Sequence, residues 1–394
     1  MKKLTAFILS ALLAGSMVLS GCSGASSGGT EVEGLMLIRT VGIDAGDGIG
    51  MEKPAKITVC TGVGLNAEPP QILSREDESI AAAVENLKYN ATGLEPFFSH
   101  TQQVLLGEAA AEDSFSASMD WMLRSMEIRL DTEIYVARGG TAEEILAGTE
   151  GTTTSVSDML SLFRETAAKT GQGYVYSCGE IASSLLANGS ALIQAVELKT
   201  ADVGAEGAGS WEVQPSGYAV ISGDTLVGYT VPALTYAVCI LTNHLDTAVM
   251  QVELQEGNFT LMVENASVEY TPEFSQTGEL SRVQVDLNAS CTVLQMESSA
   301  NLVDAAVRQQ VADAVEDKLK TNAESVIRGS VQMGVDFLDI GGACRRKAPG
   351  KYDSMPTAWN EQFPLTEYAV SAEVKVERTY DLIHPMERQE DSTF

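Results

Sequence analysis

The pattern of apolar and polar positions is most regular in the last third of the chain. "NFTLMVENASVEYT" and "SRVQVDLNASCTVLQM" alternate between the two kinds of residue, which predicts two β-strands with one buried face each. Residues 366–380 alternate in the same way. Between these strands, residues 301–329 predict one long amphipathic helix, because apolar residues recur at every fourth position. These positions are Val303, Val307, Val311, Val315 and Leu319. We therefore expect a C-terminal domain in which a long helix packs on an antiparallel-type sheet.

The first 150 residues predict short strands that alternate with helices. "GLMLIRTVGID", "AKITVCTGVGL", "TQQVLLGE" and "DTEIYVARG" have the composition of strands. "SIAAAVENLKYNA" predicts a helix with Ile80, Val84 and Leu87 on one face and Ser79 as its N-cap. "SFSASMDWMLRSM" predicts a second helix, and the middle of the chain is helical first and β-rich later. The predicted fold class is α+β, with three mixed α/β-layer domains.

Composition shifts suggest where these domains begin and end. The Gly/Thr-rich segment 148–155 separates two periodic blocks, and a second change falls near residue 245. We therefore predict an N-terminal domain, a middle domain and a C-terminal domain, preceded by a signal and a tether and followed by a short tail. In that order, the signal, tether, three domains and tail comprise residues 1–21, 22–30, 31–147, 148–245, 246–385 and 386–394.

The N-terminus has the organisation of an export signal. Lys2 and Lys3 precede an apolar run at residues 6–19, which is shorter than the roughly 20 residues that span a bilayer. The run ends in Leu19-Ser20-Gly21-Cys22, which resembles the bacterial lipobox. In such signals the cysteine receives a diacylglycerol and becomes the new N-terminus. We predict that Cys22 is lipidated; the alternative is an ordinary secretory signal in which the cysteine is accidental.

The charge of the chain is consistent with a lipid anchor. The formal net charge is −29, and removal of the two signal lysines leaves −31 on the mature chain. Such an acidic body is repelled by anionic lipid headgroups and by nucleic acid, so its attachment to a membrane cannot be electrostatic. Residues 23–30 are a Ser/Gly-rich tether with a reach of about 15 Å. We expect no second membrane segment, since the best candidate, residues 228–245, contains Pro232 and several polar residues.

The sequence contains no recognisable catalytic or metal-binding motif. No nucleophile elbow, phosphate-binding loop or zinc-protease motif occurs, and His100, His244 and His384 are too scattered for a triad or a zinc site. For His100, beside two phenylalanines, we predict a packed, hydrogen-bonded structural role; the alternative is a role as a general base. We therefore predict a protein that is not an enzyme and needs no cofactor. The five cysteines after Cys22 form no CxxC pair, and the sequence leaves open whether any of them forms a disulfide. They are Cys60, Cys178, Cys239, Cys291 and Cys344.

Several segments match a known family in the same order. "RTVGIDAGDG", "EPFFSHTQQVLLGEAAAE" and "DWMLRSMEIRLDTEIYVARGGTAEEIL" resemble the N-terminal region of the Ger(x)C family, the lipoprotein C subunit of spore germinant receptors. The family's A-x-G-I-D, FFSH, R-x-x-E-I-R and V-A-x-G elements fall at residues 41–44, 97–100, 124–129 and 136–139. Its K-L-V-G-W and D-x-x-G-x-G…R-R-x-x-P…W stretches resemble residues 223–230 and 335–364.

The resemblance implies a function as well as a fold. Members are three-domain α+β lipoproteins on the outer face of the spore inner membrane. They assemble with a polytopic A subunit and a transporter-like B subunit into a receptor that commits a dormant spore to germinate when nutrients appear. The family has no known catalytic residues. The matched residues themselves are expected to be structural, with Gly42 and Gly139 in turns, Phe97, Phe98 and Trp121 in the core, and Trp359 packed at the last strand.

Two other classes of protein remain as alternatives. A solute-binding lipoprotein of a membrane transporter would need two similar α/β lobes, which the pattern of the last block does not favour. An exported hydrolase would need a nucleophile or a metal set, and the sequence offers neither. The nutrient, and whether this chain contacts it, cannot be predicted from the residues.

Overall fold

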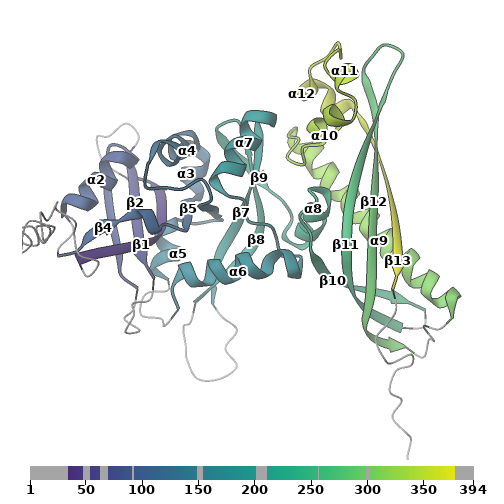
Figure 1. Ribbon diagram of the computed structural model, residues 1–394, viewed down its shortest axis with the longest axis horizontal. Coiled ribbons are helices and arrows are strands. Elements are labelled where there is room, and N and C mark those ends of the chain that lie inside the picture. The colour runs from purple at the N-terminus through teal and green to yellow at the C-terminus, as the bar shows by residue number, and fades with distance from the viewer. Residues whose placement is uncertain are drawn as a thin grey trace, which may run out of the picture.

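The computed structural model describes residues 34–47, 54–62, 70–90, 93–148, 154–200, 211–255, 257–298, 302 and 304–377. They form two halves, each built on one β-sheet, arranged side by side in an elongated molecule (Figure 1). The α+β fold class predicted from the sequence is confirmed. None of the helices within these ranges combines the length and the apolar character needed to cross a membrane.

The first sheet has the order β3-β2-β1-β5-β6-β7-β8-β9, with β4 paired to β1. Its central strands β1, β5, β6 and β7 run parallel, because helical crossovers connect them, whereas β2, β3, β8 and β9 are added by antiparallel pairing. The strands are Leu35–Ala45 (β1), Ala55–Thr61 (β2), Ile72–Asp77 (β3), Glu95–Phe97 (β4), Gln103–Gly107 (β5), Glu133–Ala137 (β6), Ser190–Thr200 (β7), Trp211–Ser222 (β8) and Thr225–Tyr229 (β9).

Helices cover both faces of this sheet. On one face lie α2 (Ile80–Asn90), α3 (Glu108–Asp113), α4 (Phe115–Arg124) and α7 (Cys178–Asn188). On the other face lie α5 (Ala142–Ala147) and α6 (Val156–Thr170). Every residue of β5 and β6 is buried, as expected for strands between two helical layers. The predicted N-cap of α2 is confirmed, since the Ser79 hydroxyl accepts a hydrogen bond from the Ala82 amide at 3.2 Å.

The second sheet has the order β10-β11-β12-β13, formed by Thr247–Leu254, Gly257–Phe274, Leu280–Ser298 and Glu367–Val376. The first three strands are antiparallel, but β13 lies parallel to β12. The chain crosses over between them through a helix, which brings β13 back in the same direction. The alternating strands predicted from the sequence are thus present, and the last pairing differs from a purely antiparallel sheet.

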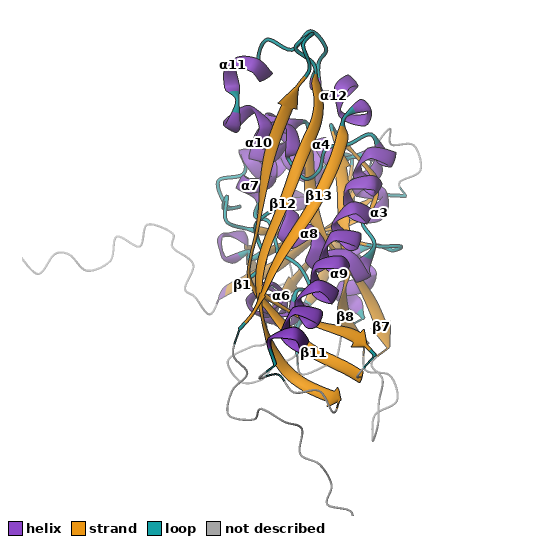
Figure 2. Ribbon diagram, turned by 90° about the vertical axis from the view of Figure 1, so that its right-hand side faces the viewer, coloured by secondary structure: helices purple, strands orange, loops and turns teal. Residues whose placement is uncertain are grey.

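The long helix α9 (Ala305–Met333) lies across one face of this sheet (Figure 2). It begins where the Asp304 carboxylate accepts a hydrogen bond from the Ala306 amide and ends at Gly334, whose φ is 67°. Its buried stripe includes Val311, Val315 and Leu319, as the spacing of four predicted. The helix starts and ends about one turn later than the predicted range, residues 301–329. Short elements complete this half: α8 (Thr235–Leu241), α10 (Ile340–Lys347), α11 (Pro349–Tyr352), α12 (Trp359–Gln362) and the 3₁₀ helices η3 (Pro232–Leu234) and η4 (Phe363–Leu365). A further 3₁₀ helix, η2 (Phe98–His100), lies in the first half between β4 and β5.

The two halves share one apolar core. Leu192 and Tyr218 of the first sheet belong to the same buried cluster as Val238 of α8 and Phe259 of β11. The end of α6 also reaches the second sheet, where the Asp246 amide donates to the Ala168 carbonyl at 3.2 Å. The first sheet combines strands from residues 31–147 with strands from residues 148–245. The predicted domain boundary at residues 147/148 stays a prediction.

Candidate functional site

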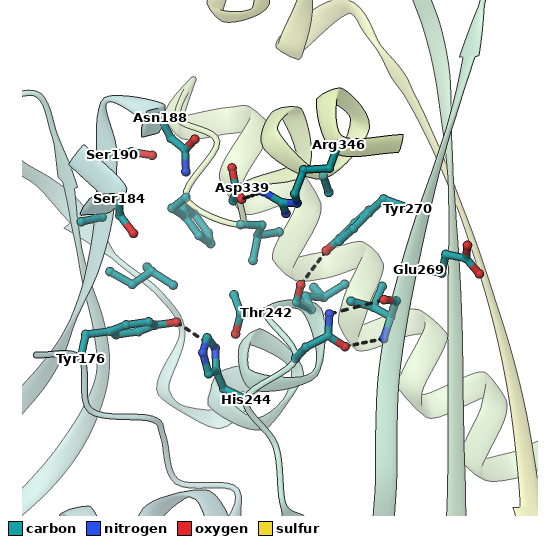
Figure 3. A pocket seen from close by; sticks show the side chains of 18 of the residues that line it. Tyr176, Ser184, Asn188, Ser190, Thr242, His244, Glu269, Tyr270, Asp339 and Arg346 are labelled. Atoms are coloured by element: carbon teal, nitrogen blue, oxygen red, sulfur yellow. Dashed lines mark hydrogen bonds and ion pairs between the residues drawn. The ribbon is translucent and has the colours of Figure 1, made fainter. Parts of the chain in front are cut away.

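A cavity of about 490 Å³ lies at the junction of the two halves (Figure 3). Its walls come from the segment before α7, from α7 and β7, from the end of α8, from β11, and from α10 with the loop that precedes it. The apolar part of the lining includes Leu192, Leu241 and Phe337. The polar part includes Tyr176, Ser184, Asn188, Thr242, His244, Glu269, Tyr270, Asp339, Arg346 and Lys347.

His244 is held between aromatic rings on one side of the cavity. Its ring stacks on Tyr174, with centroids 4.0 Å apart, and meets the edge of Tyr176 at 5.4 Å. The His244 Nδ1 and the Tyr176 hydroxyl oxygen are 3.4 Å apart. Burial lowers the pKa of His244 below its usual value, and the nearby Glu180 carboxylate opposes this only in part. The imidazole is therefore neutral at pH 7.

The charged residues on the opposite side of the cavity occur in pairs of opposite sign. The Arg346 Nη1 donates to the Asp339 Oδ2 at 2.9 Å, and the Lys347 ammonium contacts the Glu269 carboxylate. Asp339 has a φ of 58°, a left-handed conformation that is unfavourable for a residue with a side chain. The lining thus has no net formal charge and combines paired ions with a neutral imidazole.

None of the five cysteines that the structure describes lines the junction cavity. The cysteines Cys60, Cys178, Cys239, Cys291 and Cys344 are all buried free thiols. Burial raises the pKa of Cys60 to about 12 and that of Cys239 to about 11, so neither is a thiolate at neutral pH. Among the residues that the structure describes, no three His, Cys, Asp or Glu side chains are grouped so as to hold a metal ion.

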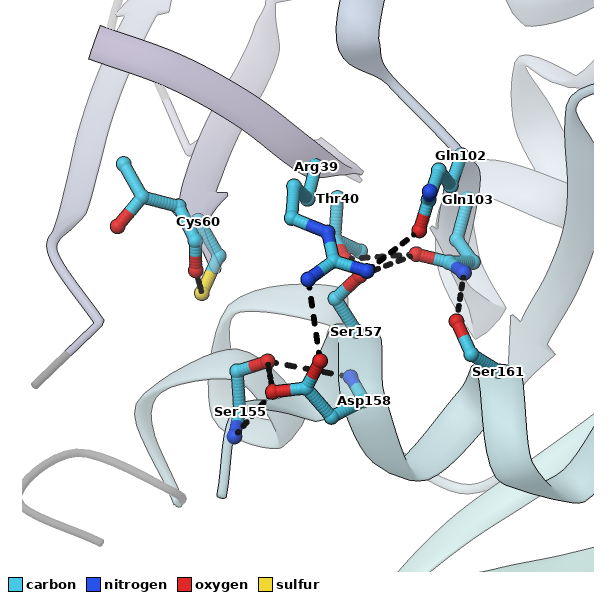
Figure 4. A network of polar contacts seen from close by, with 10 residues as sticks. Arg39, Thr40, Cys60, Gln102, Gln103, Ser155, Ser157, Asp158 and Ser161 are labelled. Carbon is cyan, nitrogen blue, oxygen red and sulfur yellow. Dashed lines mark hydrogen bonds and ion pairs between the residues drawn. The ribbon is translucent and has the colours of Figure 1, made fainter. Parts of the chain in front are cut away.

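A second group of polar residues lies beneath α6 in the first half (Figure 4). Gln103 of β5 is fully buried, and its amide oxygen accepts from Ser157 at 2.8 Å while its amide nitrogen donates to Ser161 at 3.0 Å. Nearby, the Arg39 guanidinium pairs with Asp158 at 3.1 Å. These contacts join α6 to β1 and β5 and satisfy buried polar groups, so this network positions the helix.

The glycine and aspartate of residues 41–44 have a structural explanation. The Asp44 carboxylate accepts hydrogen bonds from the amides of Ala142 and Glu143, at 2.7 and 3.0 Å, and so caps the start of α5. Gly42 lies within β1, and a Cβ there would come within 3.0 Å of Ala142 and Leu146. The predicted turn at Gly42 is therefore wrong, because glycine is needed there for close packing of α5. Gly139, with a φ of 73°, does lie in a turn.

The residues around Phe97 differ partly from prediction. Phe98 is 1% exposed and belongs to the core, whereas Phe97 is only half-buried. His100 is exposed and lies 5.7 Å from the Phe97 ring, so its predicted packed, hydrogen-bonded role is wrong. Trp121 is half-buried at the edge of the core, not inside it. The 3₁₀ turn η2 buries Phe98 and leaves the His100 side chain in solvent, which the residue pattern alone does not predict.

Within residues 335–364, one buried carboxylate holds several elements together. The Asp336 side chain accepts hydrogen bonds from the amides of Ile340 and Gly341 and from the indole of Trp359. Trp359 lies 5.4 Å from the Phe363 ring, and Phe363 lies 5.8 Å from Tyr368 of β13. The matched aspartate, glycine and tryptophan thus build the support of α10, which forms one wall of the cavity.

The structure does not place the predicted lipidation site, because Cys22 lies outside the described residues. The cavity residues His244, Tyr174 and Tyr176 were not predicted as a group. Tyr176 and His244 are 68 positions apart in sequence, and they meet only because α8 packs beside the segment that precedes α7. The only indication in the sequence was that His244 follows an apolar run, and this does not show which residues His244 contacts.

The fold defines an α+β protein with two unlike halves and a polar cavity at their junction. Residues 28–198 match a family model described as "Spore germination protein N-terminal domain", and residues 216–380 match "Spore germination B3/ GerAC like, C-terminal". A solved structure entitled "Crystal Structure of the GerBC protein" is similar in fold, with a TM-score of 0.55 and 13% identity, covering 86% of this chain and 97% of that one. A comparison with curated proteins found no match. The chain belongs to the Ger(x)C family, the C subunits of spore germinant receptors.

Proposed function

We propose that this chain is a non-enzymatic, lipid-anchored subunit of a nutrient germinant receptor. It assembles with a polytopic A-type subunit and a transporter-like B-type subunit, and the complex triggers germination of the spore. The observation that carries this proposal is the match of most of the chain, in order, to the two family models. The similar fold of GerBC along most of both chains is consistent with it.

The anchor of this subunit is a lipid on Cys22. The lipobox-like residues 19–22 support this role, and the Ser/Gly-rich residues 23–30 supply a tether. Two or more acyl chains on one cysteine are sufficient for stable membrane attachment. The body then lies at the outer face of the spore inner membrane, where it meets its partner subunits.

The junction cavity does not make the chain a solute-binding lipoprotein of a transporter. Such a protein closes two similar lobes around its ligand. Here the halves have different sheets, and they share a core that includes Leu192 and Phe259. A hinge motion that opened the two halves would expose these apolar side chains to water, which is unfavourable. The receptor role needs no such motion.

Deletion of the gene in its sporulating host tests the proposed function. Spores that lack the chain should lose their response to the nutrient that this receptor recognises. They should still germinate when a stimulus bypasses the receptors, because the downstream machinery is intact. Spores that fail by both routes, or that respond normally to every nutrient, would contradict the receptor assignment. Capture of the tagged chain from spore membranes should also recover the A-type and B-type subunits.

A further inference from the structure

A groove of about 900 Å³ runs between α2 and α4 on the surface of the first half. One wall is formed by α2 and the other by α4, and the ends of β1 and β2 close the floor. Both helices lie on the same face of the first sheet (Figure 1). Its apolar lining consists of Ala45, Pro54, Ala55, Ile80, Ala81, Val84, Ala117 and Trp121.

The dimensions of the groove suit a short helix. With 11 residues in α2 and 10 in α4, the walls are about 15 Å long at a rise of 1.5 Å per residue. A docked helix of the same length makes two to three turns and presents three or four side chains to an apolar floor, which is the helix-in-groove mode of recognition. Ala81 and Ala117 are exposed on the two walls and leave room for larger side chains from a partner.

The rim of the groove is acidic. Its five carboxylates are those of Glu78, Glu85, Asp113, Asp120 and Glu127. The two cations in the lining are already paired: Lys88 lies 2.8 Å from Glu127, and Arg124 lies 2.7 Å from Asp120. Within the described part of the chain, Glu78 and Asp113 form no ion pair. The rim therefore attracts lysine and arginine and repels anionic lipid and nucleic acid.

Trp121 gives the groove an anchor. The indole is half-buried in the wall formed by α4, and among the described residues its N–H makes no hydrogen bond. Tryptophan contributes a large apolar area at interfaces, and its N–H normally finds an acceptor when it becomes buried. A partner that covers Trp121 would supply that acceptor.

We propose that this groove binds a short amphipathic α-helix of a partner protein, with its apolar face on Trp121 and the alanine walls and with lysine or arginine beside the rim. The apolar lining of the groove requires an apolar face on the bound helix. The unpaired carboxylates of Glu78 and Asp113 favour basic side chains at the edges of that face. The inference goes beyond the receptor assignment, because it depends neither on the lipid at Cys22 nor on which subunit supplies the helix.

The test uses the full lipidated chain in phosphatidylcholine nanodiscs, with empty nanodiscs as the blank. The probe is a synthetic leucine/lysine peptide of about 14 residues with one apolar helical face, and a scrambled peptide of the same composition serves as its control. Binding is measured by titration calorimetry for the native chain, for Ala117→Glu and for Leu123→Glu. Leu123 is an exposed residue of α4 outside the groove, so both variants add the same charge to the same helix.

The direction in which the peptide affinity changes distinguishes binding in the groove from general electrostatic attraction to an acidic protein. Ala117→Glu fills the groove, so the amphipathic peptide should bind about ten-fold more weakly to this variant, whereas Leu123→Glu should leave its affinity within about two-fold. Ala81→Glu, on the opposite wall, should behave as Ala117→Glu does, and circular dichroism should show all variants folded. Equal or tighter binding to Ala117→Glu and Ala81→Glu, or equal binding of the scrambled peptide, would overturn the proposal. Membership of the receptor family would be unaffected by that result.

Discussion

The Trp359 indole donates a hydrogen bond to the Asp336 carboxylate, with 2.9 Å between Nε1 and Oδ2. The same carboxylate accepts from the first amides of α10, at 3.0 Å from Ile340 and 2.7 Å from Gly341. The Ser190 hydroxyl, on β7 of the first half, donates a hydrogen bond to the Asp336 carbonyl oxygen at 2.9 Å. Asp336 therefore connects α10, Trp359 at the start of α12 and Ser190 of the first sheet, and it supports one wall of the junction cavity.

Asp336→Asn should destabilise the protein more than Trp359→Phe does. The asparagine amide turns a donor toward backbone amides that need acceptors, which costs about 2–3 kcal/mol, whereas loss of the indole N–H removes one hydrogen bond worth about 1–2 kcal/mol. Unfolding in urea checks both values. A double-mutant cycle should give a coupling energy of at least about 0.5 kcal/mol; additive effects would mean that the hydrogen bond contributes nothing to stability.

Val311→Asp should destabilise the second half strongly. Val311 is fully buried in α9, so the substitution places an unpaired carboxylate in an apolar core at a cost on the order of 4 kcal/mol or more. Gln309→Asp is the matched control, because Gln309 is exposed two positions away on the same helix. It places a second carboxylate near Asp313 and should cost under about 1 kcal/mol. Equal unfolding curves for the two variants would show that the buried face of α9 is assigned wrongly.

The stability of the junction should fall as the pH is lowered past the usual pKa of histidine. His244 has a pKa below its usual value of 6.5 because of burial, so below pH 6.5 the unfolded chain binds a proton that the folded chain does not. The groups that face it are Tyr174, Tyr176 and, on α7, Glu180. The free energy of unfolding should therefore decrease between about pH 7 and about pH 5.5, and His244→Gln should reduce this slope. An unchanged slope would exclude His244 as its source.

Cys22→Ala should release the chain from the membrane and leave its fold intact. The mature chain carries a net charge of −31 after loss of the two signal lysines, so electrostatics do not replace the lipid. Loss of the tether also lowers the effective concentration of the body near its partners, so nutrient-triggered germination should be impaired. Fractionation of spore membranes measures the first effect. Normal recovery of the variant in the membrane fraction would contradict the anchor, and germination that bypasses the receptors should remain normal as a control.

The thiols should react only when the protein unfolds. All five described cysteines are buried, and burial raises the pKa of Cys344 to about 12. A thiol reagent at neutral pH should therefore modify none of them in the folded protein and all of them in denaturant, while reductant should leave the melting temperature unchanged. Rapid modification before unfolding would contradict the buried state of these residues.

The sequence by itself determined the elements that have a periodic buried face. The valines spaced four apart predicted α9, and alternation predicted β11, β12 and β13. In each of these segments one face is buried, so apolar residues recur with the period of the helix or strand. The order of motifs along the chain also gave the family, since their sequence and spacing do not depend on contacts. The lipidation of Cys22 is a sequence prediction of the same kind, and it awaits the fractionation experiment.

Only the tertiary structure decided which distant residues meet. Gly42 packs against α5, which begins a hundred residues later in the chain, and its strand pattern does not show that a helix would cross there. The same holds for the contact of Tyr176 with His244 and for the place of Trp121 in a groove between two helices. Periodicity reports whether a residue is buried, but strand order and helix packing decide what it is buried against, and those depend on the whole chain at once.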